Sequence, residues 1–346
     1  MVDLQGLGAC CDGCASTPAA VRIARRRLLK AAVFGPAAVP AGAGPGDDHG
    51  LGFAMPGELP RAVMGKVIDV SPQVLVISQG STELRLALTA DVSAWRGGPA
   101  DPEGLHIDDV AVIRLDPARR GVADRIWCNI GRVTGTIIEC QDNTLLVDPG
   151  TGRERQVVVV PSRAASRIQV RYPNLRPGYL MDVIGLRWPG HLEAIVPATP
   201  QPVYPVTRLP EPPLVSGHVP GTISGSATWR EPAGEPYGLL GVGYPALDPD
   251  AGCAAEPPGQ AAAGFVRMPY LSVGSLLRIR NQCSGAQCVL PVTSCAPIAR
   301  LFNDRCLTCA TSPRGRIAEL TLASFVALGG ELERGCFNAT ITVGER

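Results

Sequence analysis

Lysine is almost missing from this chain, which has only Lys30 and Lys66 among its 32 basic residues. Arginine supplies the rest, and 31 acidic residues leave a formal net charge of +1. A nucleic-acid-binding protein needs a concentrated positive surface, so this balance predicts no nucleic-acid partner. Aromatic residues make up only 5% of the chain, which excludes an extended flat platform for stacking on ligands.

Long apolar runs are missing as well. The apolar stretch within 22–44 is interrupted by Pro36 and Pro40 and is too short to span a bilayer, so we expect no stable membrane span. Glycine and proline, in contrast, are abundant, with 40 and 33 residues. Together with few helical heptads, this composition favours a turn-rich, all-β protein. The length of 346 residues leaves room for two to four domains.

Residues 1–44 are predicted to be an export signal. The run Arg25-Arg26-Arg27-Leu28-Leu29-Lys30 has the paired arginines, apolar residues and lysine of a twin-arginine signal, and Ala41-Gly42-Ala43 has the small residues of a cleavage site. The start of an amphipathic helix would explain fewer of these features. We therefore expect export by the twin-arginine route to the cell envelope or the extracellular space.

An internal repeat follows the signal. Residues 65–78 match 135–148 position by position, which gives a period near 70 residues. Each copy reads as strand, turn and strand, and this period suits two tandem small antiparallel barrels over 60–128 and 129–197. The copies resemble small OB-like domains of exported bacterial proteins. They contain no aromatic pair or basic stripe, so a spacer or interaction role is expected.

The acidic residues of these repeats are a possible calcium site. The sequence contains no D-x-D-x-D-G loop, however, and solvated loop positions are the better interpretation. The residues concerned are Asp91, Asp108, Asp109 and Asp182.

Residues 198–221 are rich in proline. Proline at this density favours extended polyproline II structure and excludes sheet interiors. The segment is therefore predicted to be a semi-rigid linker that holds the tandem barrels apart from a C-terminal domain over 222–346.

Nine cysteines follow the signal, and in an exported protein this density predicts disulfides. The pairing cannot be read from the sequence, and the odd number leaves one thiol free or intermolecular. The candidates are Cys128, Cys140, Cys253, Cys283, Cys288, Cys295, Cys306, Cys309 and Cys336. A zinc site using Cys306-x-x-Cys309 with Cys295 or Cys288 is the alternative. Only one tight pair is present, without a nearby histidine, so we expect no metal and no cofactor.

Four motifs organise the C-terminal domain: GSATW at 225–229, MPY at 268–270, a hairpin over 274–294 and AELTLASFVALGG at 318–330. Together they indicate strand pairs around one short helix, with Thr321 as its cap and Gly329-Gly330 as its stop. In order and spacing they resemble the double-psi β-barrel domains of the rare lipoprotein A (RlpA), expansin and barwin families. The resemblance implies a six-stranded double-psi barrel and a peptidoglycan or other polysaccharide partner.

The resemblance also implies two acidic positions that the sequence only partly keeps. Cleavage of a glycan needs a carboxyl group that protonates the leaving oxygen. Ser294 occupies the first acidic position, Glu319 occupies the second, and the histidine position of RlpA-like transglycosylases falls on Phe265. A second alignment, through Asn303-Asp304-Arg305, makes Asp304 the acid instead.

Two functions therefore stay open. The first is a polysaccharide-associated protein without catalysis, in which Trp229, Tyr237, Tyr244 and Tyr270 stack on sugar rings. The second is an atypical peptidoglycan lytic transglycosylase that uses Asp304 and Glu319.

Overall fold

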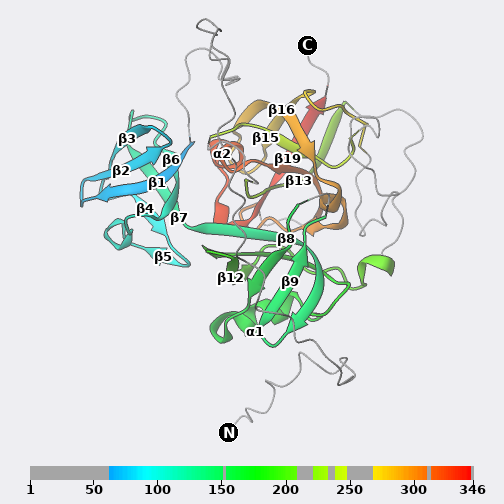
Figure 1. The fold of residues 1–346 in the computed structure, drawn as a ribbon. Helices are drawn as coiled ribbons and strands as arrows, with labels where there is room; N and C mark the ends of the chain where they lie inside the picture. Colours follow the sequence, from blue (N-terminus) through cyan, green and yellow to red (C-terminus); the bar gives the residue numbers. More distant parts are fainter. Residues whose placement is uncertain are drawn as a thin grey trace, which may run out of the picture.

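The computed structural model describes residues 62–150, 153–208, 221–232, 238–247, 268–309 and 313–343. The predicted signal 1–44 lies outside these residues, as do Tyr237, Cys253 and Phe265. The described chain forms three β units with two short α-helices (Figure 1). The predicted all-β class is confirmed.

The first unit is a seven-stranded sheet with the order β3-β2-β1-β6-β7-β4-β5. Its strands are β1 (Ala62–Val70), β2 (Val74–Gln79), β3 (Thr82–Ala87), β4 (Ser93–Trp95), β5 (Pro99–Ala100), β6 (Val110–Leu115) and β7 (Ala123–Cys128). A parallel bridge joins Ala87, at the end of β3, to Val122, just before β7. The sheet therefore curls back on itself around its own apolar cluster.

The second unit is a closed five-stranded barrel with the order β10-β12-β11-β8-β9. Its elements are β8 (Ile130–Gln141), β9 (Thr144–Asp148), β10 (Gln156–Val159), α1 (Ser162–Arg171), β11 (Leu180–Trp188) and β12 (His191–Pro197). All its pairs are antiparallel except β10 with β12. The strand order repeats that of β1, β2, β3, β6 and β7, so the two units are copies of one topology.

Helix α1 was not expected, because the prediction had a single helix in the whole chain. It follows Pro161 and buries Ala164 and Ile168, which are four residues apart and share one helix face. In the first unit β4 and β5 stand at the corresponding place between the third and fourth repeated strands.

The C-terminal unit is a closed six-stranded barrel, as predicted. Its ring runs β13-β19-β15-β16-β14-β18, the β13–β18 pair closes it, and β17 adds to β18 from outside the ring. The elements are β13 (Thr222–Trp229), β14 (Val242–Tyr244), β15 (Leu276–Asn281), β16 (Gln287–Cys295), β17 (Asn303–Asp304), β18 (Arg314–Leu320), α2 (Leu322–Ala327) and β19 (Cys336–Val343). Short 3-10 helices in the described chain lie at Pro102–Gly104, Val206–Arg208, Pro297–Leu301 and Leu332–Arg334.

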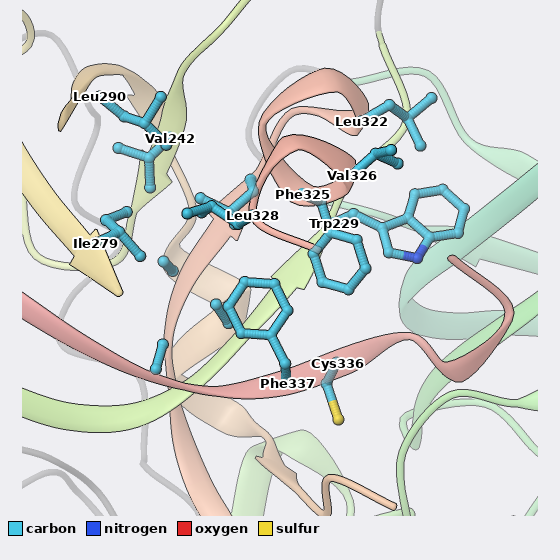
Figure 2. Packing of buried hydrophobic residues seen from close by; sticks show 14 of the residues in the cluster. Trp229, Val242, Ile279, Leu290, Leu322, Phe325, Val326, Leu328, Cys336 and Phe337 are labelled. Carbon is cyan, nitrogen blue, oxygen red and sulfur yellow. The ribbon is translucent and has the colours of Figure 1, made fainter. Parts of the chain in front are cut away.

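Helix α2 is the short helix that the sequence predicts. The Thr321 hydroxyl accepts the N-terminal hydrogen bond from the Ser324 amide, and Gly329 follows the helix with a φ of 76°. Its buried face packs into the barrel core, where Phe325 stacks on Phe337 with ring centroids 4.9 Å apart (Figure 2). Local capping and apolar spacing therefore suffice to place this helix.

The three units pack directly against one another in the described chain. The predicted linker 198–221 is described only as far as Arg208 and again from Gly221, so its role as a spacer stays a prediction. One apolar cluster contains Met64 of β1, Ile184 of β11 and Trp229 of β13. The Thr199 hydroxyl, within the predicted linker, donates to the carbonyl oxygen of Asn303 at 2.9 Å. Proline limits the backbone of this segment, but the apolar faces of the barrels still meet. Residues 209–220 lie outside the described chain.

Candidate functional cleft

A cavity of about 690 Å³ opens between the second unit and the C-terminal barrel. The second unit supplies one wall from β8, from the segment between β9 and β10, and from the β11–β12 turn. The C-terminal barrel supplies the other wall from the residues after β13, the end of β16 and Glu319 of β18. The cleft thus exists only because the repeat and the barrel dock together.

The described lining of the cleft is rich in charge. It includes three glutamates, Glu154, Glu231 and Glu319, and five arginines, Arg132, Arg153, Arg155, Arg187 and Arg230. Guanidinium groups present planar sets of donors that suit carboxylate and hydroxyl oxygens. The cleft is therefore suited to a polar ligand that carries many acceptor oxygens.

Glu231 was not among the sequence candidates, although it stands at the centre of one wall. Its carboxylate pairs with Arg187 and accepts a hydrogen bond from the Arg132 amide at 2.8 Å. Burial raises the pKa of Glu231 above its usual value, against the lowering effect of Arg187. Gly131 makes room for this carboxylate, since a Cβ there would lie 2.4 Å from Glu231 Oε1.

Arg316 brings the two predicted acids together. Its fully buried guanidinium donates from Nη2 to Asp304 Oδ1 at 2.8 Å and from Nε to Asp304 Oδ2 at 3.0 Å. Its Nη1 donates to Glu319 Oε1 at 3.1 Å. The Ser226 hydroxyl adds a hydrogen bond of 2.6 Å to Asp304 Oδ2. Both oxygens of Asp304 are therefore occupied inside the protein.

Asp182 of the second unit completes this buried cluster. Arg316 Nη2 donates to Asp182 Oδ2 at 2.5 Å, and Arg132 donates to both Asp182 oxygens at 2.7 and 2.8 Å. Burial would raise the pKa of Asp182, but the attraction of Arg132 and Arg316 outweighs it and lowers the pKa to about 2. We call Arg132, Asp182, Asp304, Arg316 and Glu319 the Arg316 network.

The expectation that the acidic residues of the repeats are solvated loop positions holds for Asp91 and Asp108, which are exposed, and is wrong for Asp109 and Asp182. Asp182 lies on β11 with no exposed surface, and Asp109 is 6% exposed and pairs with Arg96. Asp182 is buried because β11 faces the C-terminal barrel, whose Arg316 compensates the charge. The sequence of the repeat does not indicate this partner, because Arg316 lies in the C-terminal barrel.

The predicted catalytic pair is not arranged as an acid and a base in the cleft. Glu319 lines the cavity with 11% of its side chain exposed, whereas Asp304 is fully buried and is not part of the lining. A residue that protonates a glycosidic oxygen must reach the substrate within hydrogen-bonding distance. Asp304 lacks that access.

Ser294 lies where the resemblance places the first acid. Gly243 of β14 pairs with Ser294 on one side and with Glu319 on the other, so the two implied acidic positions flank one short strand. The Ser294 Oγ is buried and has no hydrogen-bond partner among the described residues. The end of β16 therefore carries a buried hydroxyl group and no carboxyl group.

The predicted sugar-stacking residues do not form a binding face. Trp229 is 1% exposed and donates from Nε1 to the Leu332 carbonyl oxygen at 2.8 Å, and Figure 2 shows its ring in the barrel core. Tyr244 has no exposed surface. Both lie on barrel strands at positions that face inward, so neither ring can stack on a sugar. Tyr270 is 62% exposed but does not line the cleft.

The cysteines only partly follow the disulfide prediction. Cys283 and Cys309 form a disulfide, and Cys295 is also disulfide-bonded. Cys128, Cys306 and Cys336, which were disulfide candidates, are instead buried free thiols. Cysteine packs well in apolar cores, which accounts for this burial. Cys140 on β8 and Cys288 on β16 are half-buried.

A scan against protein-family models matches no family, and a search of curated proteins finds no matching relative. Within the described ranges, no helix has both the length and the apolar character needed to cross a membrane. The cleft and its residues are therefore the features of this protein that indicate its function.

Proposed function

We propose that this protein is an exported cell-envelope protein that binds a polysaccharide in the cleft between its second unit and its C-terminal barrel, without cleaving it. The observation that carries the proposal is the polar, arginine-rich cavity of about 690 Å³ beside Glu319 and Ser294. Its volume falls in the range of ordinary ligand sites, roughly 300–1,000 Å³.

The lining suits a sugar better than an apolar molecule. Sugars offer ring oxygens and hydroxyls along their whole edge, and acidic sugars add carboxylates that arginine binds with two hydrogen bonds. Arg153 and Arg155 belong to the segment that enters the cleft between β9 and β10, and Arg155 is exposed. These two side chains are the ones we expect to contact ligand first.

The proposal that the glycan is not cleaved is supported by the first acidic position and by Asp304, although Glu319 and Glu231 do line the cleft. Ser294 carries no carboxyl group, and the carboxylate of Asp304 is engaged by Arg316 and Ser226. Serine cannot act as a glycosidic acid at neutral pH. The site therefore supports recognition of a glycan more strongly than its hydrolysis or elimination.

Export is supported by the arginine pair at Arg25-Arg26 and by the disulfides at Cys283, Cys309 and Cys295. Disulfides persist in oxidising compartments and are rare in the cytosol. Peptidoglycan and extracellular polysaccharides are found in the same compartments.

The binding test is co-sedimentation of the purified full chain with insoluble peptidoglycan and with cellulose. We expect retention on at least one of them and a loss of roughly tenfold in affinity for the double variant Arg153→Ala, Arg155→Ala. Arg85→Ala is the matched control, because Arg85 is an exposed arginine of β3 on the first unit. If the wild-type chain sediments with neither material and soluble polygalacturonate does not bind either, the proposal is wrong.

The lytic alternative is tested on the same material. Glu319 is the one predicted acid that lines the cleft, so an enzyme that works through the predicted pair would lose its activity in Glu319→Gln. We expect the wild-type chain to release no soluble muropeptides from peptidoglycan. Release that disappears in Glu319→Gln, while the variant keeps its binding, would replace the binding proposal by an enzymatic one.

A further inference from the structure

Three cysteines that do not line the cleft gather in the C-terminal barrel. Cys283 lies in the turn between β15 and β16, and Cys306 and Cys309 lie in the segment between β17 and β18. Their sulfur atoms all lie within 4.8 Å of one another. The cluster joins the motif Cys306-x-x-Cys309 to a third sulfur 23 residues before it in sequence.

One sulfur–sulfur distance in the cluster is close to the spacing found in a thiolate metal site. Zinc bound by thiolates at about 2.3 Å in a tetrahedron places neighbouring sulfurs about 3.8 Å apart. The Sγ atoms of Cys306 and Cys283 are 3.5 Å apart, within a few tenths of that spacing. Cys283 and Cys309 are joined as a disulfide, so this pair must be reduced and separate before a metal ion can enter.

Backbone hydrogen bonds fix the positions of the cysteines in both halves of the cluster. The Cys309 amide donates to Cys306 Sγ at 3.3 Å, which holds the two motif cysteines relative to each other. On the hairpin side, the buried Asn281 accepts from the Cys283 amide at 2.8 Å and donates to the Leu328 carbonyl oxygen at 2.8 Å. Both halves of the cluster are therefore fixed by hydrogen bonds that do not depend on the disulfide.

The three cysteines differ in solvent exposure, and this difference would allow a metal ion to enter the cluster. Cys306 is fully buried, whereas Cys283 and Cys309 are half-buried, and Leu307 between the two motif cysteines is 63% exposed. An ion can reach the cluster from the solvent side and bind against a buried third sulfur.

We propose that Cys283, Cys306 and Cys309 form a redox-gated site for a thiophilic metal ion such as Zn²⁺, closed by the disulfide and opened by its reduction. Reduction adds two electrons and two protons to the Cys283–Cys309 bond and gives two thiols. With a phosphine as reductant, water supplies the oxygen of the phosphine oxide. Binding of Zn²⁺ by three thiolates then releases the three thiol protons, and the fourth coordination position is left for water or an added ligand.

The structure groups a different third cysteine with the motif than the zinc alternative from the sequence did. It combined Cys306 and Cys309 with Cys295 or Cys288, which both lie on β16. The structure brings Cys283 to the motif because the β15–β16 turn lies against the segment before β18, a contact that spacing alone does not reveal.

The test is zinc binding by the full chain before and after treatment with a phosphine, measured by competition with a chromophoric chelator. We expect one tightly bound Zn²⁺ per reduced chain beyond that of the untreated chain, and an affinity lower by more than about tenfold in Cys306→Ser. Cys295→Ser is the matched control, because reduction frees Cys295 as well. This control should bind zinc like the wild type.

Cobalt(II) provides a second measurement that does not depend on the folding of a variant. In the reduced wild-type chain, Co²⁺ should give the sulfur-to-metal charge-transfer and tetrahedral absorption bands of thiolate coordination. The proposal is overturned if the reduced chain binds no more zinc than the untreated chain. It is equally overturned if Cys306→Ser binds zinc as tightly as the wild type.

Discussion

The C-terminal barrel meets its two neighbours through junctions of opposite character. Toward the second unit, Arg316 and Asp182 are fully buried and hydrogen-bonded. Toward the first unit, Arg114 pairs with Glu331 and Arg125 with Glu333, and each of these side chains is 20–27% exposed. The two copies of one topology therefore contact the same barrel, one through buried ion pairs and the other through partly exposed ion pairs.

This difference indicates which contacts hold the two walls of the cleft together. A buried charge that loses its partner is strongly unfavourable, because neither water nor salt replaces the partner. A partly exposed ion pair is screened by solvent, and its loss changes the free energy of unfolding little. The second unit should therefore be held firmly, and the first unit should depend more on apolar contacts such as those of α2 with β1 and β6.

The largest loss of stability is expected from Arg316→Met at the buried junction. This change leaves Asp182 and Asp304 buried without their shared cation, so we expect unfolding to become easier by roughly 3–5 kcal/mol. Urea denaturation followed by circular dichroism measures the loss. A loss below about 1 kcal/mol would show that the network is not essential to the junction.

Acid should weaken the same junction in a defined range of pH. The pKa of Asp182 is lowered from 3.8 to about 2, so its contribution is complete above pH 4 and is lost as the pH falls through 2. The shift corresponds to about 2 kcal/mol of stability. Urea midpoints measured between pH 5 and pH 2 should fall accordingly. The decline should be shallower in Asp182→Asn, and an equal slope in both proteins would contradict the assignment.

The smallest effect is expected from Glu333→Gln at the other junction. Glu333 accepts from Arg125 at 2.5 Å and from the Trp127 indole at 2.5 Å, but about one fifth of its side chain is exposed. We expect a loss of about 1 kcal/mol or less, decreasing further as salt is raised. A loss as large as that of Arg316→Met, measured in the same urea experiment, would remove the distinction between the two junctions.

Much of the fold could be predicted from local sequence signals. The repeat at 65–78 and 135–148 gave the strand pairs β1–β2 and β8–β9, and Thr321 and Gly329 gave the ends of α2. These features depend on neighbouring residues, whose periodicity and capping are visible in the chain. The same is true of the hairpin β15–β16.

The site was less predictable, because its residues meet across long separations. Asp182 and Arg316 are 134 residues apart, and Glu231 belongs to no motif at all. Glu319 and Ser294, the two positions that the resemblance implies to be acidic, both flank Gly243, and this proximity was not predicted. Trp229 and Tyr244 were assigned to a ligand because aromatic rings bind sugars, yet the barrel needs the same rings for its core.

Arg132 of the second unit also contacts the C-terminal barrel. Its Nη1 donates to the carbonyl oxygen of Gly335 at 2.7 Å, while its other donors bind Asp182. Arg132, which lines the cleft, thus links the second unit to the C-terminal barrel. Separation of the two walls would leave buried charges without their partners. A polysaccharide bound as proposed would enter between walls that are held together, so its branching and chain thickness should affect binding.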